Sequence, residues 1–246
     1  DDDGSCIYEW PETSNLFFSE YAEGSSNNKY LEIYNGSDCA VDLSGYSLSS
    51  CSNGCDDGVS WDYPDNVEFA EQWLEAGQVY VVCHGSADDL IQAECDQTFT
   101  YLSNGDDVFA LTQIGSGLAL DVIGVIGVDP GSGWDVAGVS NGTKDHTLVR
   151  KSSVASGNTL WEDNPDTGEQ GSAGDDAEDS EWIVLDQNDW TFLGSHEYDS
   201  DWWACDSGDD CEIAGDINGD TIVNILDIVA LVNAIVGDYE VECGDL

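Results

Sequence analysis

The segment L-F-F-S-E-Y-A-E-G-S-S-N-N-K-Y-L-E-I-Y-N-G-S, residues 16–37, decides the fold class. Two runs of aromatic and aliphatic residues, 16–18 and 30–34, flank a stretch rich in Gly, Ser and Asn. That composition is typical of two strands joined by a turn. Similar short runs recur along the chain, at 79–82, 108–111 and 183–185. Their frequency predicts a mainly β chain folded as a β-sandwich. Within it, Asn104-Gly105-Asp106 predicts a hairpin turn before Val108.

Further blocks of sequence resemble one known family. They are V-D-L-S-G-Y-S-L (41–48), L-E-A-G-Q-V-Y-V-V (74–82), L-S-N-G-D-D-V-F-A-L (102–111), D-V-I-G-V-I-G (121–127), T-L-V-R-K (147–151), S-E-W-I-V (180–184) and L-G-S-H (193–196). Together with residues 16–37 they resemble a bacterial lamin tail domain over residues 15–199. The resemblance implies an immunoglobulin-like β-sandwich, a non-catalytic module found in nuclear lamins and in secreted bacterial proteins, often beside hydrolases. It brings no catalytic residues to this chain.

A second motif lies near the end of the chain, in G-D-I-N-G-D-T-I-V-N-I-L-D, residues 215–227. Its oxygen-bearing residues fall at positions 1, 3, 5, 9 and 12 of a twelve-residue loop, and a backbone carbonyl falls at position 7, as in an EF-hand-type calcium loop. The predicted ligands are Asp216, Asn218, Asp220, Ile222 (through its carbonyl), Asn224 and Asp227. Ca²⁺ suits these ligands better than Mg²⁺, which gives up its waters reluctantly.

This loop and the residues after it resemble one of the two repeats of a type I dockerin, the module that binds cohesins. Two features depart from that family: position 6, usually Gly, is Thr221, and a second repeat is missing. The segment 214–238 is therefore interpreted as half a dockerin, which implies a cohesin-like protein as one candidate partner.

The residues after the loop are apolar on every side. Between 224 and 236 only Asn224, Asp227 and Asn233 are polar, a pattern typical of a buried helix. The stretch is too short to span a bilayer, which takes about 20 apolar residues. We therefore expect this helix to pack against the chain's own sheet or against another molecule.

The charge of the chain limits the classes of molecule that it can bind. It carries 52 acidic and 4 basic residues, a formal net charge of −48. Nucleic acid is not expected as a partner, because its phosphates would be repelled. Self-repulsion of this size destabilises a compact state, so bound divalent cations or a saline habitat are expected.

The sequence also indicates export. It has no Met and nine Cys; a start left by cleavage of a signal peptide and an oxidising, extracellular location are expected. Close spacing suggests disulfides Cys51–Cys55, Cys83–Cys95 and Cys205–Cys211. The remaining Cys are Cys6, Cys39 and Cys243, and the odd total leaves at least one thiol free or bonded to another chain.

Three shorter segments complete the predicted organisation. Residues 1–14 are an acidic N-terminal segment or strand, 200–213 an acidic, Cys-containing connector, and 239–246 a tail. Trp202 and Trp203, in the connector, are candidates for stacking on a sugar, with a core or hinge contact as the alternative.

Few residues are candidates for catalysis or metal binding. Glu20 and Glu32 fall among strand residues and are interpreted as structural carboxylates, with a second cation site as the alternative. Arg150 and Lys151 are expected to pair with nearby acids. G-V-S-N-G (138–142) matches a nucleophile elbow, but no helix is expected after it, so we treat the match as accidental. The histidines, His84, His146 and His196, have no metal-ligand spacing. No catalytic residue is therefore predicted.

These observations favour a secreted, non-enzymatic, calcium-stabilised structural protein. Copies of it would associate, through the C-terminal helix, the N-terminal strand or both, into an extracellular filament or surface matrix. The alternative is a targeting or adhesion module that binds a polysaccharide or a cohesin-like partner. A hydrolase of unfamiliar design is the third and least supported hypothesis.

Overall fold

A computed structural model describes residues 15–70 and 72–198 of the chain. The chain divides into two compact units, Asp1–Tyr198 and Asp199–Leu246, and every described residue belongs to the first. The predicted N-terminal strand, the connector, the calcium loop, its helix and the tail lie outside the described residues.

The described residues form short strands joined by many turns. In chain order the strands are β1 (Leu16–Glu23), β2 (Lys29–Asn35), β3 (Val41–Asp42), β4 (Tyr46–Cys51), β5 (Tyr63–Glu68), β6 (Trp73–Leu74), β7 (Val79–Cys83), β8 (Gln97–Thr98), β9 (Val108–Gln113), β10 (Ala119–Ile123), β11 (Thr147–Arg150) and β12 (Trp182–Leu185). The helical elements are α1 (Asp89–Ala93) and two 3₁₀ turns, η1 (Leu43–Gly45) and η2 (Ser52–Gly54). None of these helices is long and apolar enough to cross a membrane.

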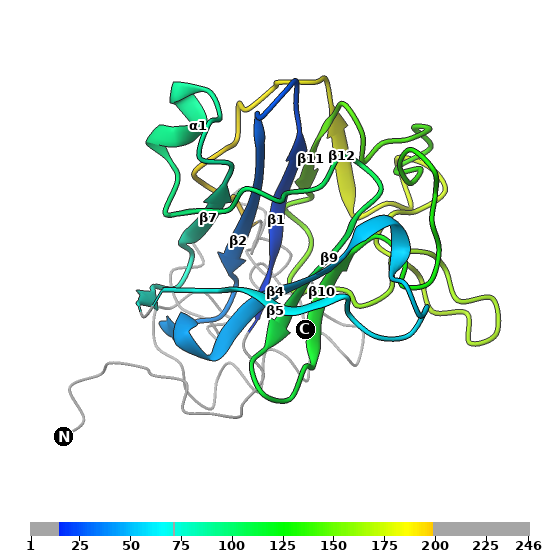
Figure 1. Ribbon diagram of the computed structural model, residues 1–246, viewed down its shortest axis with the longest axis horizontal. Coiled ribbons are helices and arrows are strands. Elements are labelled where there is room, and N and C mark those ends of the chain that lie inside the picture. Colours follow the sequence, from blue (N-terminus) through cyan, green and yellow to red (C-terminus); the bar gives the residue numbers. More distant parts are fainter. Residues whose placement is uncertain (1–14, 71, 199–246) are drawn as a thin grey trace, which may run out of the picture. The chain divides into compact units, whose positions relative to one another are not determined.

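The strands form two main sheets (Figure 1). The larger has the order β12-β11-β1-β2-β7-β8 and the smaller the order β10-β9-β4-β5; β3 and β6 pair by themselves. Every pairing is antiparallel except that of β7 with β8. The described residues thus form the mainly β, immunoglobulin-like sandwich that the sequence predicts.

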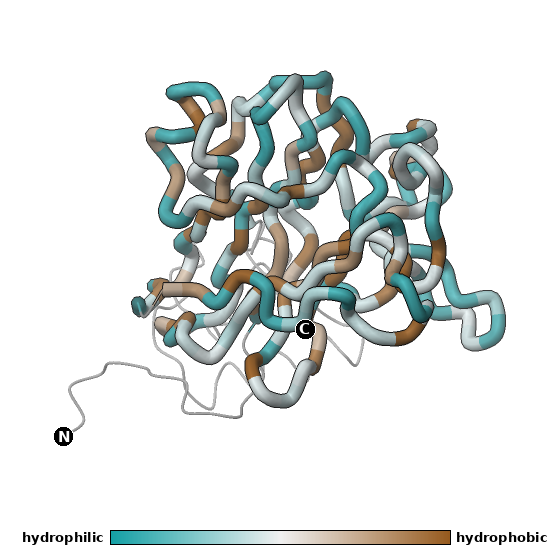
Figure 2. The backbone as a smooth tube through the Cα atoms, viewed as in Figure 1, coloured by the Kyte–Doolittle hydropathy of each residue, from teal (hydrophilic) through white to brown (hydrophobic). Residues whose placement is uncertain are grey.

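The hydrophobic core fills the space between the two sheets. Along β2, Leu31 and Ile33 point into it, while Tyr30, Glu32 and Tyr34 point to the other face of the sheet. The hydrophobic residues follow the strands in Figure 2, and the hydrophilic ones gather in the connecting turns. Burying one such aliphatic or aromatic side chain contributes about 1.5–3 kcal/mol, so this core is the main source of stability.

A β-bulge changes the alternation of β1. Phe18 pairs with Ile33, but the next paired residue is Glu20, opposite Glu32, which leaves Ser19 as the extra residue. Bulges reorient the side chains that follow them. Phe18 therefore faces the core while Glu20 faces outward.

The outer face of the larger sheet is itself covered. Helix α1 and the chain around Trp190 pack on it, forming a second cluster of Ala22, Tyr30, Val81, Cys83, Ala87 and Ile91 with Cys95, Trp190 and Leu193. Asp88 caps α1 by accepting the Leu90 N–H (3.0 Å). This cover encloses the carboxyl groups of β1 and β2.

Two of the suggested disulfides are confirmed. Cys51 is bonded to Cys55 and Cys83 to Cys95. Cys39 is disulfide-bonded as well. The suggested Cys205–Cys211 bridge lies outside the described residues.

The predicted hairpin at Asn104-Gly105-Asp106 is wrong in its pairing. Residues 104–106 do form bends, with Gly105 at φ +107°. However, the preceding strand, β8, belongs to the larger sheet and the following one, β9, to the smaller. The turn therefore carries the chain between layers, because turn chemistry specifies a reversal and not the partner of each strand.

Candidate functional site: a buried ion pair, a carboxyl pair and an open cleft

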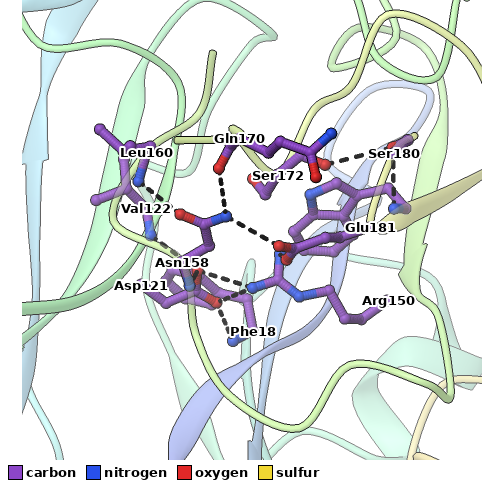
Figure 3. A network of polar contacts seen from close by, with 11 residues as sticks. Phe18, Asp121, Val122, Arg150, Asn158, Leu160, Gln170, Ser172, Ser180 and Glu181 are labelled. Atoms are coloured by element: carbon purple, nitrogen blue, oxygen red, sulfur yellow. Dashed lines mark hydrogen bonds and ion pairs between the residues drawn. The ribbon is translucent and has the colours of Figure 1, made fainter. Parts of the chain in front are cut away.

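The charged centre of the domain lies between the sheets (Figure 3). Asp121 and Arg150 are 0% and 1% exposed, and Arg150 Nη2 donates to both carboxylate oxygens of Asp121 at 2.8 Å. Backbone N–H groups of Phe18 (2.8 Å) and Asn158 (2.9 Å) donate to the same carboxylate. Burial raises the pKa of Asp121, while the Arg150 charge and these N–H groups oppose the rise.

Arg150 is enclosed on its other sides. Its guanidinium lies 4.3 Å from the centre of the Trp182 ring and 5.7 Å from that of Phe17. Such cation–π contacts are stabilising when water is excluded. Glu181 Oε2 lies 3.6 Å from Nη1. The predicted pairing of Arg150 with acids is therefore confirmed.

Asn158 extends this network to the loops (Figure 3). Its Nδ2 donates to Glu181 Oε1 (2.9 Å) and to the Gln170 carbonyl (3.2 Å), and its Oδ1 accepts the Leu160 N–H (2.9 Å). The network thus ties β1, β10 and β11 to the long loop between β11 and β12. Lys151 behaves differently from the prediction, because its Nζ donates to the backbone carbonyls of Ala177 and Glu178 instead of to a carboxylate.

The second grouping is the pair Glu20 and Glu32, on the outer face of the same sheet. Both are buried, at 1% and 0% exposure. Tyr30 donates its hydroxyl to Glu20 Oε2 (2.6 Å), and Ser19 donates to Glu32 Oε1 (2.7 Å). The Gly194 N–H donates to Glu32 Oε2 (2.7 Å).

This pair has no basic partner among the described residues. Burial, and then the charge of Glu32, raise the pKa of Glu20 to about 8. Burial raises the pKa of Glu32 to about 7, and Glu94 and Asp96 add to the rise. Near neutral pH Glu20 is therefore largely protonated and Glu32 partly so, because the buried carboxyl groups have no cationic partner among the described residues.

The structure brings no third ligand to this pair. In residues 15–70 and 72–198, no group of three or more His, Cys, Asp or Glu side chains is arranged to hold a metal ion. The hydrogen bonds from Tyr30, Ser19 and Gly194 are those expected of structural carboxyl groups. The predicted calcium ligands, Asp216, Asn218, Asp220, Ile222, Asn224 and Asp227, lie outside the described residues, and so do Trp202 and Trp203.

The third feature is an open cleft of about 630 Å³. Both sheets contribute to it, together with the turn between β1 and β2 and the loop before β9. Its lining includes Asn27, Lys29, Asn53, Tyr63, Asn66, His84, Tyr101 and Asp107. These residues come from segments far apart in the sequence, which explains why no sequence pattern revealed the cleft.

With this geometry established, comparison with known proteins finds a family that part of the chain is similar to. Residues 10–127 match the Lamin Tail Domain family. The match is shorter than the span 15–199 suggested by the resemblance, and it ends before β11 and β12, which extend the same sheet as β1. No curated protein and no solved structure matched the chain.

The lamin tail domain is a structural, immunoglobulin-like domain that is not typically catalytic. The segment that resembled a nucleophile elbow fits this description. Residues 138–142 form turns around an isolated bridge between Val136 and Val139, with no helix after them. The strand–turn–helix geometry that the elbow requires is therefore missing from this segment.

The three histidines, all among the described residues, have separate surroundings. His196 stacks edge-on against Phe17 and Tyr34, and burial lowers its pKa to about 4. His146 Nδ1 lies 2.6 Å from the Lys144 carbonyl. His84 lines the cleft, where its Nδ1 accepts the Ser86 N–H (3.0 Å).

Sequence reasoning missed Asp121, the acid at the charged centre. One signal was available: a single carboxylate within the apolar run A-L-D-V-I, residues 119–123. A charge in such a run is buried only when it is paired. The identity of the partner, 29 residues further along, required the fold.

Proposed function

We propose that this chain is a secreted, non-enzymatic structural protein, stabilised by calcium, whose copies associate as subunits of an extracellular filament or surface matrix. The buried position of Arg150 is the observation that supports a structural, non-enzymatic role. The chain has 4 basic residues in total, and this one is fully enclosed between the sheets against Asp121. It holds strands and loops together where no substrate reaches it, which supports a scaffold and not a reaction centre.

The calcium and assembly parts rest on residues 214–238, outside the described residues. Five side chains and one carbonyl at EF-hand spacing support a Ca²⁺ site. The apolar stretch 224–236 loses free energy if it stays in water, about 1.5–3 kcal/mol for each large side chain. A second copy of the chain is one surface able to cover it.

The larger sheet offers an edge for association. Among the described strands, β12 ends the sheet, and Ile183 on it is 45% exposed. Addition of a strand from another molecule to such an edge gives main-chain hydrogen bonds and apolar contact together. The edge at β5 is less suitable, because Pro64 lacks an N–H and Asp65 has φ +49°.

Sedimentation velocity and electron microscopy of the full chain test this proposal. Species larger than the monomer are expected with Ca²⁺ and should disappear with a chelator. Asp216→Ala combined with Asp220→Ala should prevent their formation. Asp209→Ala combined with Asp210→Ala removes the same charge from the connector and should not. A monomer under all these conditions, in oxidising buffer, contradicts the proposal.

A targeting or adhesion module is the second candidate function. Two exposed tyrosines in the cleft favour it, because aromatic rings left in water at the mouth of a cleft are typical of binding surfaces. In this hypothesis the domain binds a polysaccharide, and the half-dockerin, residues 214–238, binds a cohesin-like partner. Trp202 and Trp203 are the other candidate surface for a polysaccharide.

A further inference from the structure

We propose that the cleft between the two sheets is a binding site for a neutral oligosaccharide chain. The inference gives the targeting candidate its ligand site, and it does not depend on self-association or on the calcium loop. Four observations support it: the size of the cleft, its exposed aromatic rings, its unused hydrogen-bonding groups and its charge.

The size fits a segment of a sugar chain. Ligand sites in proteins have volumes of about 300–1,000 Å³, and this cleft has about 630 Å³. One wall comes from the smaller sheet, through β4, β5 and β9. The other comes from the β1–β2 turn, His84 and the loop after β8.

Aromatic rings stand in this cleft where water reaches them. Tyr63, on β5, is 51% exposed, and Tyr101, in the loop after β8, is 79% exposed. Phe99 packs against Tyr101 with ring centres 5.9 Å apart, which restricts the orientation of that ring. A pyranose ring has an apolar C–H face and a rim of hydroxyls. The flat face and phenolic hydroxyl of Tyr match both.

Several polar groups of the lining are unused. Among the described residues, the side-chain amides of Asn27 and Asn53 and the hydroxyls of Tyr63 and Tyr101 have no hydrogen bond. An amide offers both donors and an acceptor, which suits neighbouring hydroxyls on one sugar. His84 adds a donor, because its Nδ1 accepts the Ser86 N–H and the proton of the neutral ring is then on Nε2.

The polar groups already in use hold the cleft in shape. Asp107 accepts the backbone N–H groups of Asn53 (3.2 Å) and Asn104 (3.3 Å), and Asn66 Nδ2 donates to Ser50 Oγ (3.0 Å). The Cys51–Cys55 disulfide closes the loop beside them. The site is therefore largely formed before a ligand arrives, which lowers the entropy lost on binding.

Charge selects a neutral ligand over an acidic one. Lys29, the basic residue of the lining, is already bound to Glu23 (3.1 Å) and to the Ser103 carbonyl (2.8 Å). Asp107 also borders the cleft, and the net charge of −48 repels anions from a distance. Hydroxyl-rich, uncharged sugars avoid this repulsion, whereas phosphates, sulfates and uronic acids do not.

Isothermal titration calorimetry of the full chain, in oxidising buffer with Ca²⁺, tests the site. The probes are malto-, cello-, xylo-, manno- and chito-hexasaccharides at millimolar concentration, with polygalacturonate and heparin fragments as acidic comparators. We expect at least one neutral probe to bind. Tyr63→Ala and Tyr101→Ala should each weaken its Kd at least tenfold, and Asn27→Asp, which removes an amide and adds a charge, severalfold. The control is Trp73→Ala, which removes an aromatic side chain that is 49% exposed and outside the cleft.

Each outcome is decisive. Binding that Tyr63→Ala and Tyr101→Ala reduce, and that Trp73→Ala leaves intact, supports the proposal. Failure of all neutral probes to bind, equal binding by the cleft variants, or binding of acidic probes alone overturns it. Unchanged thermal unfolding of the variants confirms that they are folded. Because a monomer is sufficient for this titration, failure to assemble and failure to bind sugar are distinguished.

Discussion

Strand β1 has a buried carboxyl site on each of its faces, and the two sites are neutralised in different ways. Between the sheets, Asp121 receives the Phe18 N–H and the guanidinium of Arg150. On the outer face, Glu20 and Glu32 receive hydroxyls and one backbone N–H, and they face each other without a cation. One site depends on a fixed positive charge, and the other on protons from the solvent. Loss of Arg150 should therefore destabilise the site between the sheets, whereas a change of pH should affect the stability of the outer site.

The largest effect is expected from Arg150→Met. It leaves Asp121 buried without its cation, and breaking a buried pair in this way costs about 3–5 kcal/mol. Urea unfolding with intact disulfides measures the loss. Lys144→Met is the matched control, because it removes the same charge from a residue without an ion pair and should cost under about 0.5 kcal/mol. If the two variants lose the same stability, Arg150 acts only through the net charge of the molecule and not through its pairing with Asp121.

Combining Arg150→Met with Asp121→Asn sharpens the same test. The double variant buries no charge at this centre, so its loss of stability should be smaller than the sum of the two single losses. Residues in direct contact show interaction energies of about 0.5–3 kcal/mol in such cycles. Strict additivity in urea unfolding would mean that the pair is not coupled.

Glu20→Gln tests the outer site through pH. The raised pKa means that folding favours the protonated form, so the stabilising effect is complete below pH 4.5 and is lost as pH rises to about 8. One pKa unit corresponds to about 1.4 kcal/mol, so the loss across this window is on the order of a few kcal/mol. In Glu20→Gln the slope of stability against pH should be flatter, and the variant should be more stable than the parent above pH 8.

The matched control is Glu178→Gln, which removes one exposed carboxylate. Its slope should stay close to that of the parent chain. A parent whose stability does not fall between pH 4.5 and pH 8, measured by urea titration at each pH, would contradict the raised pKa of Glu20.

The smallest effect is expected from Gly194→Ala. Gly194 has φ +93°, and its N–H donates to Glu32. Left-handed backbone costs a residue with a Cβ about 1–3 kcal/mol, and here any shift also moves a donor of the outer site. Gly115→Ala is the control, since φ is +82° and nothing lies within 4 Å of the added Cβ. Urea midpoints should fall further for Gly194→Ala than for Gly115→Ala.

The sequence predicted the strands and the sandwich because both follow from local composition and turn spacing. Cys51–Cys55 and Cys83–Cys95 were also predictable, since short loops bring their thiols together. The face of the sheet on which Glu20 lies was not predictable. Simple alternation places residues 18 and 20 on one face, and only the bulge at Ser19 separates them. The cleft was unpredictable for a related reason: Tyr63 lies on β5 and Tyr101 in the loop after β8, and only the fold brings both to one cleft.

The order of strands in the larger sheet has a consequence for where this domain can be cut. The segment that matches the lamin tail family stops at residue 127, so it includes Asp121 but neither Arg150 nor β11, the neighbour of β1. A fragment ending there would contain the acid without its base and would turn a central strand into an exposed edge. Expression of residues 10–127 alone should therefore yield aggregates, whereas a fragment extended to residue 198 retains both the guanidinium and the neighbouring strand.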